Sequence, residues 1–563
     1  MYIAITRKKY KDTYHEQILL RESYREDGKV KTRTLLNLSN QPKEQVQAIA
    51  AALKNKSDIV ITANNQSQGK TVGLTFVIVF LMNLLGMLRV FGKTFEAKIA
   101  LMLIAARITV QSSRLQALAW AKDEDKILDL LELDEEAKEK LNKKTIYLGL
   151  DYMYDNQEII ENKLFKSYYK NNPPKRVFYD VTSSYVTGEY SDSELVSYGY
   201  NRDKKQGTQQ IVIGLLTDEN GHAISIHTYK GNTNDVKTFS DQLDKLKQRF
   251  NLENITIVGD GGMIKSEDIH TIREMGYDFI TSIGKPSIQA LIDNKESKIE
   301  MSLFDENLKE IIENDTRYIL RQNPLRRDEI RETRESKLER LEEFIKEKTD
   351  YYNTHYRAKS VTLQKHIDKK ISDLKLNKFV TVTITYKEGD VKTINRDKEE
   401  VFKTKEIATT TIEIDEKEKA KVEQLDGCYV VTSSLIDTSK DSKEEIHKAY
   451  KTLIKVENAF KTLKTEFLEI RPLYLKTDER IQGHIALSMH AYNITLKLKE
   501  FISISVGTKK SELDFKSTIR ELSTVKTVVN TINKAIKFET IPTVSNTLKT
   551  LFINMKLKFP TKI

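Results

Sequence analysis

Three carboxylates that lie far apart in the sequence are candidates for shared chemistry. Asp180 in "FYDVTS" and Asp260 in "IVGDGGM" each follow an apolar run that is typical of a strand. If these two strands are neighbours, both aspartates reach the same edge of one sheet, where clefts form in α/β folds. Carboxylates held a few ångströms apart repel one another unless cations lie between them, and oxygen ligands select hard ions such as Mg²⁺. The pair therefore predicts a divalent-metal site.

Glu457 is the candidate for a third metal ligand. It lies in "AYKTLIKVENAFKTLKTEF", residues 449–467, which we expect to form one helix. On such a helix Tyr450, Lys461 and Lys464 fall within about 40° of Glu457, so they could hold the phosphates of a scissile strand. Two metal ions about 4 Å apart can activate water and stabilise the leaving oxygen in phosphodiester cleavage. The apolar residues of the segment form an adjoining stripe for the core: Ala449, Val456, Phe460, Leu463 and Phe467.

Each of these acids also has a simpler explanation when it is taken alone. A single acid after a strand commonly caps or turns the chain. A glutamate flanked by lysines on a helix is typical of a solvated face with ordinary Glu–Lys pairs. Two aspartates at matched positions, together with an isolated glutamate between bases, favour the metal site over these simpler explanations.

The elements that must position the aspartates follow from the hydrophobic pattern of residues 173–285. Three strand-like runs come first, followed by an amphipathic helix, a buried strand, a second helix and a last strand. This β-β-β-α-β-α-β order predicts a mixed α/β sheet with flanking helices. The runs are 176–183, 209–218, 221–231, 235–250, 254–260, 266–276 and 277–284.

The pattern changes on both sides of this region. Residues 1–40 resemble β-hairpins whose many lysines and arginines would suit either a DNA-contacting sheet or a soluble edge. The region 286–440 looks like an α+β insertion with a long charged helix, typical of an exposed helix, and several strands. We therefore predict six regions. Residues 1–40 form β-hairpins, residues 41–172 a helical DNA-binding domain, and residues 173–285 the first part of the α/β sheet. Residues 286–440 form the insertion, residues 441–505 contain the acidic helix, and residues 506–563 form a Lys-rich, helical C-terminal region.

Composition favours a polyanionic partner in a reducing compartment. The chain has 563 residues, and its 92 Lys+Arg against 82 Asp+Glu give a net charge of +10. The single cysteine, Cys428, excludes an internal disulfide and a multi-cysteine zinc site. The polar N-terminus carries no secretory signal. Residues 71–88 carry no charge, and we expect a buried core helix there and no membrane span.

Together these residues resemble the DDE transposases of bacterial insertion sequences, which have an RNase H-like catalytic core. The most similar branch carries a β-rich insertion before the acidic helix and a Tyr-x2-Arg-x3-Glu-x6-Lys signature. Tyr450, Glu457 and Lys464 stand at those spacings, whereas Leu453 occupies the arginine position. Gly261 also departs from the larger residue that usually follows the second aspartate. The runs "GYNRDKKQGTQQIVIGLL" and "YKGNTNDVKTF" match the family between the two aspartates.

The resemblance implies a metal-dependent enzyme that binds the terminal inverted repeats of its element, cleaves DNA and joins the 3′-OH ends to target DNA. It implies two Mg²⁺ or Mn²⁺ ions held by Asp180, Asp260 and Glu457, with Tyr450 and Lys464 as DNA contacts. It further implies a homodimer on paired ends and action in the bacterial cytoplasm, at the nucleoid. A catalytically silent DNA-binding relic and an RNase H-like nuclease without strand transfer remain open at this point.

Overall fold

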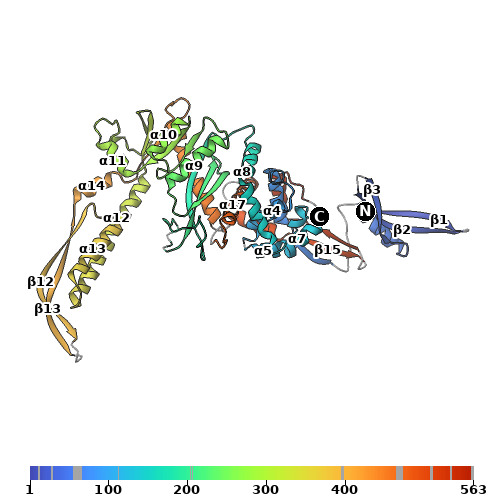
Figure 1. Cartoon of the computed structure of the whole chain (residues 1–563), viewed down its shortest axis with the longest axis horizontal. Coiled ribbons are helices and arrows are strands. Elements are labelled where there is room, and N and C mark those ends of the chain that lie inside the picture. The colour runs from blue at the N-terminus through green and yellow to red at the C-terminus, as the bar shows by residue number, and fades with distance from the viewer. Residues whose placement is uncertain are drawn as a thin grey trace. The chain divides into compact units, whose positions relative to one another are not determined.

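Contacts among the described residues of the computed structural model divide the chain into two compact units. One unit is Met1–Gln157 with His490–Ile563, and the other is Glu158–Met489. Figure 1 labels helices and strands of both units. The structure describes residues 1–10, 13–26, 29–54, 66–111, 113–202, 205, 207–394, 399–464, 473–506, 511–532 and 536–559.

The unit Glu158–Met489 is built on a mixed sheet, the central sheet, which contains eight strands among the described residues. Their order is β10-β11-β14-β9-β8-β5-β6-β7. β5 pairs in parallel with β8 and antiparallel with β6, and β8 pairs in parallel with β9. The strands are β5 (Arg176–Tyr185), β6 (Gln210–Asp218), β7 (Ala223–Lys230), β8 (Thr256–Val258), β9 (Asp278–Ile283), β10 (Lys309–Glu313), β11 (Thr316–Gln322) and β14 (Cys428–Ser433).

The central sheet confirms the predicted β-β-β-α-β-α-β order and the RNase H-like mixed α/β fold. The two helices of that order are α9 (Asp235–Gln248) and α10 (Ser266–Glu274). Alternate residues of β5, Val177, Tyr179 and Val181, share one buried cluster with Phe239, Leu243 and Leu246 of α9. Alternate residues of the strand therefore pack against residues of the helix that are three or four positions apart. Each large side chain buried there contributes roughly 1.5–3 kcal/mol to the stability of the fold.

The predicted insertion of residues 286–440 is wider than the part that leaves the central sheet. β10, β11 and β14 join that sheet, and Val430 of β14 pairs with Ile283 of β9. The remainder forms an arm with its own buried cluster. The arm contains α12 (Pro324–Thr354), α13 (Ser360–Leu374), β12 (Val380–Ile394), β13 (Glu400–Ile414) and α14 (Glu416–Gln424). α11 (Lys285–Asp293) and a 3-10 turn at Met301–Leu303 precede it.

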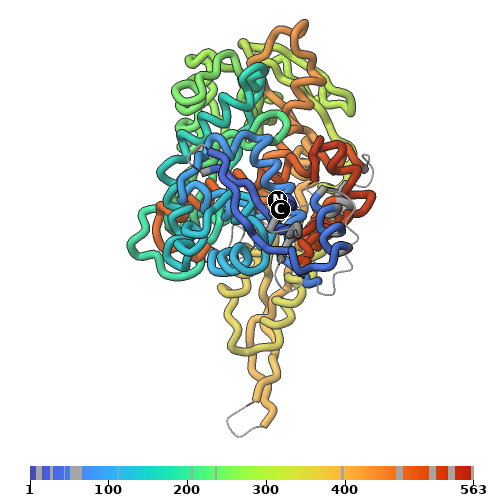
Figure 2. The backbone as a smooth tube through the Cα atoms, turned by 90° about the vertical axis from the view of Figure 1, so that its right-hand side faces the viewer, coloured from blue at the N-terminus to red at the C-terminus, as the bar shows by residue number. Residues whose placement is uncertain are grey.

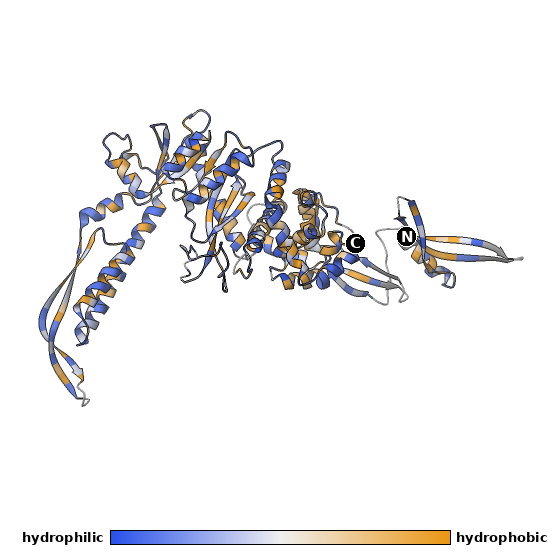
Figure 3. Ribbon diagram, viewed as in Figure 1, coloured by the Kyte–Doolittle hydropathy of each residue, from blue (hydrophilic) through white to orange (hydrophobic). Residues whose placement is uncertain are grey.

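The charge pattern of α12 predicted an exposed helix, but one side of α12 is buried. Leu338, Leu341 and Ile345 are buried against α13 and the β12–β13 hairpin. Figure 3 shows the resulting alternation of apolar and polar residues along the arm. A buried ion pair holds α12 at the base of the arm: the Arg334 guanidinium lies 2.7 Å from a carboxylate oxygen of the fully buried Asp426.

The N-terminal β structure is confirmed. The sheet is formed by β1 (Tyr2–Tyr10), β2 (Thr13–Glu26) and β3 (Lys29–Asn37). The first half of β2 pairs with β1 and the second half with β3. Its small core combines Ile18, Leu20 and Leu38 with Val46 of α1 (Lys43–Lys54). Residues 27 and 28, between β2 and β3, lie outside the described residues.

The helical regions 41–172 and 506–563 also contain strands, which corrects their prediction as purely helical. β4 (Gln66–Thr71) pairs with β15 (Lys526–Ile532), and β15 pairs with β16 (Ile536–Thr540). β4 is polar and gains its strand structure from this distant pairing, which local periodicity does not encode. The helices of the first region that follow α1 are α2 (Gly73–Leu84), α3 (Met87–Phe91), α4 (Phe95–Thr109), α5 (Arg114–Ala119), α6 (Ile127–Leu130), α7 (Glu135–Lys140) and α8 (Leu148–Tyr168). The helices of the second region are α18 (Ser511–Thr524) and α19 (Asn546–Asn554), and α17 (Asp478–Val506) precedes them. A π-helical turn spans Trp120–Glu124 and a 3-10 turn Thr145–Tyr147. The backbone tube in Figure 2 follows these segments from blue to red.

The uncharged segment 71–88 forms a buried helix, as expected. Most of α2 is buried, and Gly86, with φ 77°, separates it from α3. That positive φ favours glycine and ends the helix well short of the segment's full length. Among the residues that the structure describes, no helix is long and apolar enough to cross a membrane.

Candidate active site

The pairing of β5 with β8 brings the two aspartates to the same level of the central sheet. Each β5 residue pairs with the β8 residue 80 positions later, as Arg176 does with Thr256. Asp260 also follows Asp180 by 80 positions. The two aspartates therefore lie in the same register as the paired residues, two positions beyond the last pair. The expected adjacency of the strands is therefore confirmed.

Asp180 does not end its strand, which corrects one part of the prediction. β5 continues to Tyr185 because it stays paired with β6 over its whole length. Asp260 does lie beyond its strand, two residues after Val258. Since neighbours Tyr179 and Val181 face the core cluster, the Asp180 side chain points to the opposite face of the sheet.

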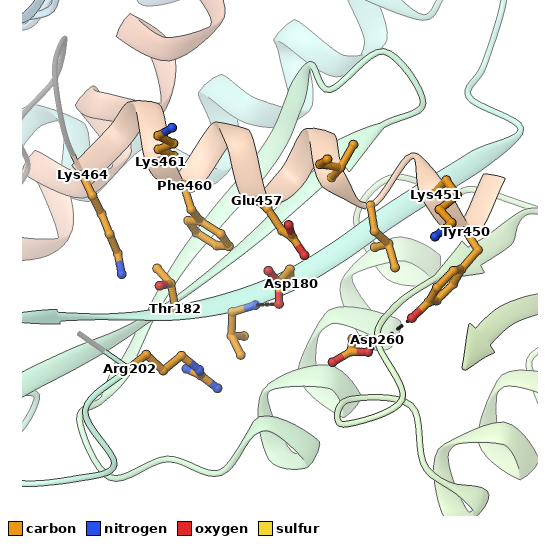
Figure 4. A pocket seen from close by; sticks show the side chains of 13 residues that line it. Asp180, Thr182, Arg202, Asp260, Tyr450, Lys451, Glu457, Phe460, Lys461 and Lys464 are labelled. Atoms are coloured by element: carbon orange, nitrogen blue, oxygen red, sulfur yellow. Dashed lines mark hydrogen bonds between the residues drawn. The ribbon is translucent and has the colours of Figure 1, made fainter. Parts of the chain in front are cut away.

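Glu457 reaches Asp180 from a helix on that opposite face. α16 (Ile454–Lys464) packs on β5 and β6 through buried Val456, Phe460 and Leu463. Glu457 projects from α16 toward Asp180 (Figure 4), and Lys464 extends to the same side of the helix. The predicted apolar stripe is thus confirmed from Ala449 to Leu463, whereas Phe467 lies outside the described residues.

The single helix predicted for 449–467 is interrupted. α15 (Lys443–Lys451) ends at a turn formed by Thr452 and Leu453, and α16 starts at Ile454. The Thr452 hydroxyl donates to the Lys448 carbonyl at 2.9 Å, and such back-bonding bends helices. The backbone N–H of Leu453 donates to the Tyr450 carbonyl, three residues back, which tightens the turn.

All six predicted site residues line one cavity of about 640 Å³. They are Asp180, Asp260, Glu457, Tyr450, Lys461 and Lys464. The interruption of the helix therefore does not separate Tyr450 from Glu457. The cavity lies wholly within the unit Glu158–Met489.

The electrostatics of the cavity favour a bound cation. The pKa of Asp180 is raised to about 7, mainly by burial and in part by the charges of Glu457 and Asp260, while the Val181 N–H and Arg202 oppose the rise. The carboxylates of Asp260 and Glu457 form no ion pair with any described residue. Three oxygen ligands that line one cavity fit a hard divalent ion.

Among the described residues, no group of three or more His, Cys, Asp or Glu side chains is arranged so that it could hold an ion. Figure 4 shows Glu457 and Asp180 facing each other, with Asp260 beside Tyr450. The donor chemistry of the three carboxylates nevertheless fits a metal ion.

Tyr450 and Gly261 position Asp260. The Tyr450 hydroxyl donates to the Ser282 hydroxyl oxygen at 2.8 Å and lies 3.5 Å from an Asp260 carboxylate oxygen. Burial raises the pKa of Tyr450, so its hydroxyl stays a donor. A Cβ at Gly261 would lie 2.1 Å from the Ser282 carbonyl oxygen, which explains why this chain has glycine after the aspartate.

Arg202, Thr182 and Lys451 also line the cavity. The prediction singled out neither Arg202 nor Lys451. Arg202 lies in the run "GYNRDKKQGTQQIVIGLL" between β5 and β6, which the sequence had marked only as a family match. Its backbone N–H donates to the Ser183 hydroxyl at 3.0 Å. Leu453, which replaces the signature arginine, lines the same cavity, so Arg202 supplies a guanidinium there from a different element.

Comparisons with known proteins show the family of the chain. A family model described as "Transposase DDE domain" matches residues 171–494, and one described as "IS1634 family transposase, N-terminal domain" matches residues 3–63. No curated protein matches the chain. The solved structures that resemble it include a piggyBac transposase synaptic complex with hairpin DNA, with 9% identity, coverage of 81% of this chain and 82% of that chain, and a TM-score of 0.35. Another is the Mos1 transposase paired-end complex with left transposon end, which is 14% identical. That match covers 30% of this chain and 59% of that chain, with a TM-score of 0.14. The match to the DDE domain covers more than half of the chain. The chain therefore belongs to the DDE transposases of insertion sequences.

Proposed function

We propose that Asp180, Asp260 and Glu457 are the catalytic carboxylates of this transposase and that they hold two Mg²⁺ or Mn²⁺ ions. DDE transposases generally use divalent metal ions. The observation that carries the assignment is that three acids from distant parts of the chain line one cavity. When bound, the ions would supply a nucleophilic water and stabilise the leaving oxygen of a phosphodiester.

The chain's own residues bind and orient the DNA strand. Lys461 and Lys464 provide positive charge along α16, and Arg202 provides it from the facing loop. A guanidinium can bind a phosphate through two parallel hydrogen bonds, which a lysine cannot do. Tyr450 keeps Asp260 in place through the bonds described above and contacts the strand at the cavity's edge.

The regions outside the central sheet recognise the DNA ends. The N-terminal sheet and the helical region 41–172 bind the terminal inverted repeats, and the basic strand β3 suits a phosphate-rich groove. Two copies pair the two ends before cleavage, and the exposed 3′-OH groups attack target DNA. This activity takes place on DNA at the bacterial nucleoid.

The product of the reaction tests this function. The full chain is incubated with Mg²⁺, labelled DNA from the regions flanking its gene and an unlabelled target plasmid, and the ends are mapped by sequencing. A transposase joins the labelled 3′-OH ends to the plasmid. A nuclease on the same fold yields cut ends only, and a DNA-binding relic shifts the DNA without cutting it. Either of the last two results would refute strand transfer.

A further inference from the structure

Two lysines that line the active-site cavity lie on opposite sides of Glu457. Lys464 is the last residue of α16, seven positions after Glu457, and Lys451 is the last residue of α15, six positions before it. Figure 4 shows Lys464 at one end of the cavity and Lys451 at the other, next to Tyr450, with the carboxylates of Glu457 and Asp180 between them. The cavity therefore carries positive charge at both ends of its acidic centre.

Lys451 is held at its end of the cavity by an aromatic ring. Its ammonium nitrogen lies 4.9 Å from the centre of the ring of Tyr429, a residue of β14. The Tyr429 hydroxyl is hydrogen-bonded to Nε2 of His447, and the two rings are stacked. His447 precedes Lys451 by one turn of α15, so both residues lie against the same ring. Because burial raises the pKa of Tyr429, the ring stays neutral, and this contact positions the Lys451 ammonium without neutralising its charge.

A DNA strand that crosses this cavity presents one negative phosphate per nucleotide. The phosphate that is cleaved must lie at the three carboxylates, where the proposed metal ions would be bound. Glu457 and Lys464 are separated by seven residues, which is about 10 Å along a helix axis and corresponds to roughly three nucleotides of one strand of a duplex. The Lys464 end can therefore hold phosphates on one side of the cut, and the Lys451 end lies where the strand continues on the other side.

We propose that Lys451 binds the DNA backbone on the side of the cleaved phosphate opposite to Lys464, so that the cavity holds the strand on both sides of the cut. This inference rests on the proposed function, because the strand must lie across the three carboxylates. Contacts on both sides fix the orientation of the phosphodiester bond between them, whereas a contact on one side leaves that bond free to rotate. Lys451 thus positions the strand, although it is not part of the Tyr-x2-Arg-x3-Glu-x6-Lys signature.

Neutral phosphates locate the contact of each lysine. A methylphosphonate removes the negative charge of one phosphate, and a series of labelled element ends carries one such group, in either strand, at positions within about three nucleotides of the cut. Single-turnover cleavage in Mg²⁺ is measured on every DNA for the full chain, Lys451→Ala and Lys464→Ala. We expect Lys451→Ala to slow cleavage of unmodified DNA about 10-fold, near the lower end for a hydrogen bond between charged groups. One methylphosphonate in the cleaved strand should slow wild type by a similar factor and leave Lys451→Ala unchanged, and it should lie across the cut from the position that couples to Lys464.

Lys448→Ala is the matched control, because Lys448 is an exposed lysine of α15 that does not line the cavity. It should cleave every DNA like wild type, and thermal unfolding should show that all variants are folded. A wild-type rate for Lys451→Ala, or coupling of Lys451 to the uncleaved strand or to the same side of the cut as Lys464, would overturn the inference. Additive losses at every position for either lysine would do the same. If wild type cleaved none of the DNAs, the proposed function would fail as well, whereas normal cleavage by wild type with any of these results would refute only this inference.

Discussion

Replacement of Glu457 by glutamine should separate catalysis from folding in this protein. The Glu457 side chain is exposed on α16, and its carboxylate makes no hydrogen bond or ion pair with any described residue. Glutamine has nearly the same size and a good helix propensity. The substitution should therefore change the free energy of unfolding by less than about 0.5 kcal/mol. It also removes one of the negative charges that raise the pKa of Asp180.

The expected loss of activity follows from the charge that is removed. Two unit charges about 4 Å apart interact by about 4 kcal/mol near a protein surface. A divalent ion carries twice that charge, so about 4 kcal/mol is a lower bound for the stabilisation lost. Since each 1.4 kcal/mol corresponds to about tenfold in rate, Glu457→Gln should slow cleavage by at least about 10³-fold.

The assay measures cleavage, binding and stability on the same preparations. Single-turnover cleavage of a labelled element end in Mg²⁺ gives the rate, a gel shift in EDTA gives the affinity, and thermal unfolding gives the stability. Glu444→Gln on α15 is the matched control, because Glu444 is an exposed glutamate that does not line the cavity. It should cleave like wild type. Cleavage by Glu457→Gln at the wild-type rate would refute its assignment as the third metal ligand.

Three further predictions concern other parts of the chain. Lys464→Ala should slow turnover of bound DNA more than it weakens binding, because one phosphate contact among many supplies little affinity; comparison of single-turnover rates with dissociation constants checks this. Arg334→Met should lower the free energy of unfolding by roughly 3–5 kcal/mol in denaturant titrations, because among the described residues it leaves the buried Asp426 with Lys285, 3.3 Å away, as its one remaining ion-pair partner. Burial raises the pKa of Asp125 from 3.8 to about 6. The folded protein therefore holds that proton more tightly, and stability from this group falls by about 3 kcal/mol as the pH rises through this window. Asp125→Asn should remove that part of the pH slope.

The order of elements in the central sheet could be predicted because it depends on local patterns. Val236, Phe239 and Leu243 recur at helical spacing on α9, and the strands are short apolar runs between turns. The parallel pairing of β5 with β8 was expected only as a condition for bringing Asp180 and Asp260 together. Hydrophobic periodicity contains no information about which strands are neighbours. The register that places Asp180 and Asp260 at the same level of the sheet is set by the pairing of β5 with β8.

Features that depend on distant partners could not be predicted in this way. β14 belongs to the central sheet because Val430 meets Ile283 across about 150 residues of sequence, so a boundary drawn from local composition misses it. The contribution of Arg202 to the cavity has the same origin. It lies on a loop whose sequence lacks any helical or strand period, and its place is fixed by hydrogen bonds to Ser183 and by the bridge at Gln210.

The interruption between α15 and α16 explains how Tyr450 and Glu457 reach different parts of the central sheet. α15 packs on β9 and β14, where Tyr450 meets Ser282, whereas α16 packs on β5 and β6, where Glu457 meets Asp180. Neighbouring strands of a sheet are rotated by about 20–25° relative to one another, and two shorter helices can follow this rotation across the span. The angular relation read from an ideal helix placed both residues on one face correctly. The turn at Thr452 and Leu453 is what lets that face follow the twist of the sheet, and it brings Asp180, Asp260 and Glu457 to a common cavity.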